Sequence, residues 1–270
     1  MSKLLQRVIT ATVLFAVVLV VFFRLPTAAA AALLGAFVTM AAWEWGGFLR
    51  LEQPLLRAGY AFLVLALMLA SIAVFPDLLS LRPLLWASLV WWLIAFFWVL
   101  RYPTPIARTA GAACGIVVLV PAYLALVTLL RAGERGPEYV LLVLGIVWAA
   151  DIGAYFVGRR FGRTRLAPRV SPGKTWEGLI GGLLGAACIA AIGASALDLP
   201  IGFVVPLGVS VAAISVVGDL TVSMFKRNAG LKDSGVLFPG HGGVLDRIDS
   251  VTAAAPLFLL GISWTGLVPV

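Results

Sequence analysis

Nine apolar stretches dominate this 270-residue sequence, and each is long enough to cross a lipid bilayer. A spanning helix needs about 20 mostly apolar residues, because the lipid interior offers no partner to an unpaired backbone group. Hydrophobic residues make up 62% of the chain, which is more than a soluble protein of this size can bury. The sequence therefore predicts an all-α, polytopic membrane helix bundle. The expected spans are 7–25, 27–45, 58–75, 84–100, 109–130, 138–157, 176–197, 201–222 and 251–269.

The basic residues predict how these spans are oriented. With the N-terminus in the cytoplasm, sixteen of the 20 lysines and arginines fall in cytoplasmic segments, and four fall on the opposite side. Cytoplasmic loops of membrane proteins are enriched in lysine and arginine. We therefore expect a cytoplasmic N-terminus. The expected location is a bacterial-type inner membrane, with any active site on the cytoplasmic side, where the longest polar segments lie. The first stretch is long for a cleaved signal peptide, so we expect it to remain as a span.

No internal repeat is evident, and we expect one membrane domain over residues 1–270. Within it, residues 1–137 supply spans, whereas 138–270 carry two distinctive cytoplasmic segments. Segment 158–175 has six basic residues and no acid, and segment 223–250 is the longest polar stretch. A net charge of +8 favours anionic partners such as phosphates and lipid head groups. Segment 158–175 is also interpretable as an orientation signal alone.

Two acidic residues within the spans are candidate metal ligands. Asp151 lies in the sixth expected span, and Asp219 lies near the end of the eighth, on one helical stripe with Ser215 and Ser223. Ionisable residues in a bilayer are energetically unfavourable, so each has a functional or structural reason. Interhelical hydrogen bonding is the structural alternative for both. Glu44, between two tryptophans, is instead typical of an interfacial aromatic belt.

The second polar segment combines glycines with acids. Gly242 and Gly243 allow backbone N–H groups to face an anion, and Asp246 and Asp249 are spaced to share one face of the ninth helix. Hard carboxylate oxygens suit Mg²⁺, and the single histidine, His241, excludes a site built from several imidazoles. Capping of the helix by either aspartate is the alternative.

A long motif covers the same segment. It reads Ser223-x-Phe225-Lys226-Arg227-x4-Lys232-Asp233-x-Gly235-x2-Phe238-Pro239-x-His241-Gly242-Gly243-x2-Asp246-Arg247-x-Asp249. This run resembles the signature of the phosphatidate cytidylyltransferase family, also called CDP-diacylglycerol synthases. Two further stretches are similar to recurrent motifs of that family: Asp151-x-Gly153-Ala154-Tyr155 and Ser171-Pro172-x-Lys174-Thr175-x-Glu177-Gly178. Gly173 departs from the pattern, because many relatives have a basic residue there.

The resemblance implies transfer of CMP from CTP to phosphatidate, with CDP-diacylglycerol and pyrophosphate as products. It also implies Mg²⁺ as cofactor, either alone or with a second cation. The implied catalytic residues are Lys226, Arg227, Lys232, His241, Asp246 and Arg247. The implied substrate-binding residues are Ser171, Lys174, Thr175, Glu177, Ser223, Gly242 and Gly243. The implied metal ligands are Asp219 and Asp246, with Asp249 and Asp151 as ligands or second-sphere groups. The partners are CTP, phosphatidate and membrane lipid, with no nucleic acid, and a homodimer is left open.

Two other functions share some of these features. A transporter of a phosphorylated lipid or nucleotide is also polytopic with basic loops, but it is typically built from two related halves with broken helices near the midplane. Here the polar residues gather in one half of the chain. A CTP-dependent polyprenol kinase is the closer alternative, because it uses the same nucleotide and metal.

Overall fold

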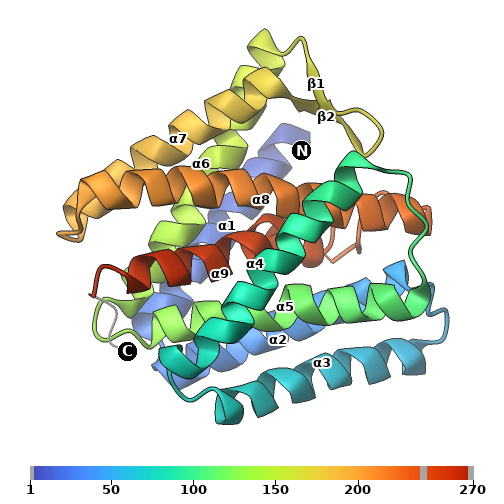
Figure 1. Ribbon diagram of the computed structural model, residues 1–270, viewed down its shortest axis with the longest axis horizontal. Helices are drawn as coiled ribbons and strands as arrows, with labels where there is room; N and C mark the ends of the chain where they lie inside the picture. Colours follow the sequence, from blue (N-terminus) through green and yellow to red (C-terminus); the bar gives the residue numbers. More distant parts are fainter. Residues whose placement is uncertain (1–2, 238–241, 267–270) are drawn as a thin grey trace.

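The computed structural model describes residues 3–237 and 242–266, and within these ranges the chain forms nine helices and one two-stranded hairpin (Figure 1). The helices are α1 (Lys3–Arg24), α2 (Thr27–Phe48), α3 (Pro54–Val74), α4 (Leu78–Leu100), α5 (Arg108–Leu130), α6 (Gly136–Phe161), α7 (Trp176–Ala196), α8 (Ile201–Ala229) and α9 (Leu245–Ser263). The strands are β1 (Arg165–Ala167) and β2 (Ser171–Thr175), which pair antiparallel. The all-α, polytopic prediction is confirmed, and every expected span coincides with a helix.

Seven of these helices, α2 to α8, are long and apolar enough to cross a membrane. They mark an integral membrane protein, whereas the number of spans and the side that each end faces stay predictions. One end of the bundle holds the hairpin and the C-terminal ends of α2, α4 and α8. There, Arg50 donates to the carbonyl of Asn228, and the Asn228 amide donates to the carbonyl of Thr104. The opposite end holds an exposed Arg135–Asp198 ion pair.

Parts of both polar segments belong to helices or to the hairpin. Helix α8 continues beyond the expected end at 222 to Ala229, and α9 begins at Leu245 rather than at 251. Hydropathy detects only the apolar part of a helix, whereas α8 ends where Gly230 adopts a left-handed conformation with φ 76°. Likewise, 158–175 is not an open loop. Its first residues finish α6, and its last residues form the hairpin.

Helix α5 is the most buried of the seven spanning helices. Aromatic side chains from neighbouring helices pack on α5 and donate hydrogen bonds to its backbone carbonyls. The Trp45 Nε1–H donates to the carbonyl of Gly111 at 3.0 Å, and the Tyr60 hydroxyl donates to the carbonyl of Ala112 at 2.9 Å. Buried Trp and Tyr side chains normally find such partners. These contacts fix α2 and α3 against α5.

Helices α6 and α7 lie in near-backbone contact along a row of glycines. A Cβ at Gly153 would meet the carbonyl oxygen of Gly181, and a Cβ at Gly182 would meet that of Ala150. Small residues allow this approach in membranes, where dispersion contacts and not water exclusion hold helices together. The hairpin joins these two helices at one end of the bundle (Figure 1). Residues of its tip therefore project from a tightly packed support.

The hairpin tip contacts other parts of the same end of the bundle. Val170, which is 1% exposed, accepts a hydrogen bond on its carbonyl from the Arg227 Nε–H at 3.4 Å. Arg169 donates to the carbonyl of Tyr102 at 3.3 Å. The hairpin thus lies across the ends of α4 and α8, and its strand β2 is placed beside the polar face of α8.

Candidate active site

A polar cavity of about 270 Å³ opens where α6, α8, α9 and the segment before α9 meet. Its lining consists only of charged or hydroxyl side chains, namely Asp151, Asp219, Lys226, Asp233, Asp246, Arg247, Asp249 and Ser250. Six of the residues predicted from the sequence are therefore brought together, although they lie on three helices and up to 98 positions apart. Asp233 was part of the long motif but was not chosen as a site residue. Its position next to Lys232 within that motif was the signal available.

The cavity depends on a close approach between α8 and α9. A Cβ at Gly218 would lie 2.6 Å from the carbonyl oxygen of Asp249 and 3.0 Å from the Cβ of Ala253. Glycine at position 218 thus allows the two backbones to meet directly. Because Asp219 follows Gly218 in the chain, this contact also sets the position of Asp219 relative to Asp249.

Replacing Gly218 with alanine is expected to separate α8 from α9 and to lower stability by about 1–3 kcal/mol, as overpacking does. The measurement is thermal unfolding in detergent. Gly59→Ala is the matched control, because the space around Gly59 in α3 is open. Equal midpoints for Gly218→Ala and Gly59→Ala would show that the close approach of α8 and α9 is not needed.

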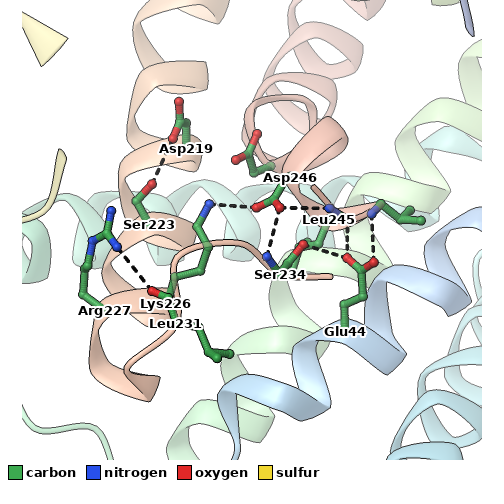
Figure 2. Close-up of polar contacts among 12 residues, drawn as sticks. Glu44, Asp219, Ser223, Lys226, Arg227, Leu231, Ser234, Leu245 and Asp246 are labelled. Carbon is green, nitrogen blue, oxygen red and sulfur yellow. Dashed lines mark hydrogen bonds and ion pairs between the residues drawn. The ribbon is translucent and has the colours of Figure 1, made fainter. Parts of the chain in front are cut away.

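Two lysines neutralise two of the cavity carboxylates. Lys174 Nζ lies 2.7 Å from Asp219 Oδ2, and Lys226 Nζ lies 2.8 Å from Asp246 Oδ1. The Ser223 hydroxyl donates to Asp219 Oδ1 at 3.2 Å, one helical turn away (Figure 2). The predicted polar stripe is therefore confirmed for Asp219 and Ser223. Ser215, one turn before Asp219 on α8, donates its hydroxyl to the carbonyl of Ala212 instead.

The ammonium group of Lys174 is held in its charged form. Burial alone would lower its pKa, but the neighbouring carboxylates of Asp219, Asp151 and Asp249 outweigh burial and raise the pKa above its ordinary value. Lys174 therefore carries a positive charge across the neutral pH range. It brings that charge from the hairpin to the edge of the cavity.

Other charged groups at the cavity have no such partner. Within residues 3–237 and 242–266, the side chains of Asp151 and Arg247 form no hydrogen bond and no ion pair. Asp249 is buried, and its Oδ1 accepts from the N–H of Ser250 at 2.8 Å. These three groups are available to a ligand that carries both positive and negative charge, such as a metal–phosphate complex.

The sequence left open whether Asp246 faces a metal site or caps a helix, and its contacts fit both. Its Oδ2 accepts from the N–H of Gly243 at 3.0 Å and from the N–H of Ser234 at 2.9 Å, while its Oδ1 pairs with Lys226. It therefore both fastens the start of α9 and faces the cavity. Gly242 has φ 80° and packs on Asp246, where a Cβ would meet the carboxylate. His241 lies outside the described residues.

The remaining predicted residues lie away from the cavity lining. Thr175 caps α7 by accepting from the N–H of Gly178, and Glu177 accepts from the N–H of Thr164. Arg227 donates to the carbonyls of Val170 and Leu231. The assignments of Ser171 at the start of β2 and of exposed Lys232 stay predictions, as do those of Thr175, Glu177 and Arg227.

The interpretation of Glu44 as an interfacial residue is wrong. Its side chain lies inside the bundle with 7% exposure and contacts the segment before α9. The adjacent tryptophans suggested an interface, but Trp45 is fully buried against Phe225 and only Trp43 is exposed. No local sequence signal reveals a partner about 200 positions away.

The cavity lining fits a divalent cation by its chemistry. Five aspartates supply hard oxygen donors, which is the ligand type that Mg²⁺ prefers. Within residues 3–237 and 242–266, no three candidate ligands converge on one point. The ion pairs explain this arrangement, because lysine ammonium groups lie against Asp219 and Asp246. A cation that bound Asp219 or Asp246 would compete with these ammonium groups for the carboxylates.

Comparisons with known proteins agree on one family. The profile described as Cytidylyltransferase family matches residues 5–264. A Pseudomonas aeruginosa protein named phosphatidate cytidylyltransferase is 46% identical over 274 residues, covering 94% of each chain. A Haemophilus influenzae protein of the same name is 42% identical over 282 residues, covering 94% of this chain and 96% of the relative. A Bacillus subtilis protein, also of that name, is 39% identical over 133 residues, which cover 48% of this chain and 49% of the relative.

Proposed function

The chain belongs to the cytidylyltransferase family, and we propose that it transfers CMP from CTP to phosphatidate in a bacterial inner membrane. The products are CDP-diacylglycerol and pyrophosphate. The observation that carries this proposal is the polar cavity at the end of an apolar helix bundle, lined by aspartates and flanked by lysines. A water-soluble nucleotide and a lipid head group can both reach such a place.

The reaction forms one P–O bond and breaks another. A phosphate oxygen of phosphatidate attacks the α-phosphorus of CTP, and the bond from that phosphorus to the bridging oxygen of the β-phosphate breaks. The nucleophile is already anionic, so the protein supplies no strong base. Its work is to align the two phosphates and to neutralise charge as pyrophosphate leaves. Lys174, Lys226 and Arg247 are the cavity cations for that task.

We assign Asp219 and Asp246 as holders of Mg²⁺, with Asp151 and Asp249 beside them. The ion, when bound, supplies charge neutralisation at the phosphates of CTP. Engagement of Asp219 and Asp246 with a cation would release Lys174 and Lys226 from their present partners. The released ammonium groups would then be free to bind phosphate oxygens.

The two substrates would enter by different routes. CTP would arrive from the cytoplasm, whereas the tails of phosphatidate would remain in the membrane while its head group enters the cavity. The exposed apolar side chains of Ile152, which follows Asp151 directly, and of Phe156, five residues after Asp151, are suited to lipid contact on α6.

A homodimer stays a prediction.

The arginines at the end of α6 are expected to raise the local concentration of anionic substrates. Replacing both Arg159 and Arg160 with glutamine is expected to raise the KM for CTP at low ionic strength. The effect should be smaller at high salt, because at 0.1 M salt exposed charges more than about 10 Å apart are largely screened. Steady-state kinetics at two salt concentrations measures this. A KM that is unchanged at low salt would leave these arginines as an orientation signal alone.

The proposed reaction is tested by following two isotopic labels from CTP. Purified protein is incubated with CTP labelled at either the α- or the γ-phosphorus, together with phosphatidate or, in a parallel reaction, with a polyprenol. The α-label is expected in the lipid product and the γ-label in pyrophosphate. Transfer of the γ-label to a polyprenol would instead identify a lipid kinase. Transport without chemical change would leave both labels in CTP.

A further inference from the structure

The buried carboxylate of Glu44 is the best-connected charged group outside the cavity. It lies on α2 and accepts three hydrogen bonds from the other end of the chain (Figure 2). Oε1 accepts from the N–H of Val244 at 2.9 Å. Oε2 accepts from the N–H of Leu245 at 2.8 Å and from the Ser234 hydroxyl at 2.7 Å. Among the described residues, no lysine or arginine forms an ion pair with it.

Two of these bonds complete the start of α9. The first N–H groups of a helix have no partner within the helix, and a side chain at the N-cap usually accepts from one of them. The N-cap residue here is Val244, which has no polar side chain. Glu44 takes that place from another helix, and its negative charge also suits the positive end of the α9 dipole.

Two glycines of the long motif lie against the carboxylate of Glu44. A Cβ on Gly235 would collide with Glu44, and a Cβ on Gly243 would collide with both Glu44 and Ser234. The N–H of Gly243 meanwhile donates to Asp246. The glycines therefore allow the chain to close around two protein carboxylates.

Ser234 links the two carboxylates directly. Its N–H donates to Asp246 Oδ2 at 2.9 Å, and its hydroxyl donates to Glu44 Oε2. Glu44 and Asp246 thus hold the same short segment from two sides. Displacement of that segment would move the Asp246 carboxylate, whose other oxygen faces Lys226.

We propose that Glu44 is a positioning residue that anchors Ser234 and the first residues of α9 to α2 and thereby fixes the Asp246 carboxylate in the cavity. This inference rests on the proposed function for its effect on catalysis, but the anchoring itself does not. An ionised group inside a membrane protein is unfavourable unless its structural surroundings compensate for it. For Glu44 the compensation comes from its three hydrogen bonds to Ser234, Val244 and Leu245. The neighbours of these residues in the chain, Asp233 and Asp246, line the cavity.

The test compares Glu44→Gln with Glu52→Gln, an exposed control close to the end of α2. Glutamine keeps the size of Glu44 but replaces one accepting oxygen with a donor that faces N–H and O–H groups. We expect the Mg²⁺ concentration for half-maximal activity to rise by about 10- to 100-fold, as loss of a group that orients a metal ligand does. Glu52→Gln should behave as the unchanged protein.

Hydrogen exchange supplies a readout that needs no substrate. In Glu44→Gln, amides of 231–250 should exchange about tenfold faster, while those of α5 and α6 remain as they are. Unchanged exchange in 231–250 would overturn the proposal, as would an equal increase throughout the bundle. If the wild-type protein transfers no CMP, the exchange result still decides whether Glu44 anchors the segment.

Ser234→Ala provides a second variant should Glu44→Gln fail to fold. It removes one of the three bonds and should give a smaller activity loss, about three- to tenfold, with faster exchange in the same segment. Where both single variants fold, the double variant should be no worse than Glu44→Gln alone, because the two residues act through one contact. Additive losses, or a fully active Ser234→Ala with unchanged exchange, would contradict the proposal.

Discussion

Asp219→Asn is expected to lower the kcat for CMP transfer on the order of 10²- to 10³-fold, the range seen when one preorganised electrostatic group is removed from an active site. The change keeps the size of the side chain but removes the charge that would hold a cation and that now pairs with Lys174. Steady-state kinetics with Mg²⁺ limiting measures the effect. Asp198→Asn is the matched control, because Asp198 is exposed at the opposite end of the bundle.

Asp246→Asn should give an equally large loss of activity together with a loss of stability. Asp246 and Lys226 are 7% and 11% exposed, so the variant leaves a buried ammonium without its counter-charge. Breaking a buried pair in this way costs about 3–5 kcal/mol. Near wild-type turnover in Asp219→Asn or Asp246→Asn, with Mg²⁺ limiting, would remove that residue from the proposed metal site.

Lys174→Ala is expected to lower kcat/KM by about 2–4 kcal/mol, which is roughly 30- to 900-fold. The ammonium is charged and partly buried. In the proposed mechanism, a cation at Asp219 would release it to bind phosphate. Kinetics and a cysteine-accessibility assay of membrane orientation are measured on the same preparation. Arg101→Ala removes an exposed cation near the hairpin and is expected to retain activity.

Full activity of Lys174→Ala with intact orientation would contradict the role of the hairpin in catalysis. The positive charge required by the reaction would then come from Lys226 and Arg247 alone. The basic segment 158–175 would remain only a signal for orientation.

The helices were predictable because hydropathy and length suffice to identify a membrane-spanning segment. The Asp219–Ser223 contact was also predictable, since residues four apart share a helix face. The hairpin was not, because β1 has three residues and β2 contains proline and glycine, a composition that suggests a loop. Alternation over so few positions gives no signal for a strand.

Contacts between segments distant in the chain could not be predicted from the sequence. Asp219 and Lys174 are 45 positions apart, and Glu44 lies about 200 positions from its partners. Such pairs follow from how α2, α8 and the hairpin pack, and helix packing is set by close contacts such as that at Gly218. The individual aspartates were recognisable as candidates, whereas their lysine partners and the anchoring role of Glu44 required the assembled bundle.

The most direct measurement of where the reaction occurs is iron-mediated cleavage of the backbone. Fe²⁺ is substituted for Mg²⁺ in the presence of CTP, ascorbate and peroxide are added, and the cuts are mapped by mass spectrometry. The proposed site predicts cuts in α8 near Asp219 and in the first turns of α9 near Asp246, suppressed by excess Mg²⁺ and lost in Asp219→Asn. Cuts confined to other segments, such as the opposite end near Arg135 and Asp198, would contradict the assignment of the aspartate cavity as the catalytic centre.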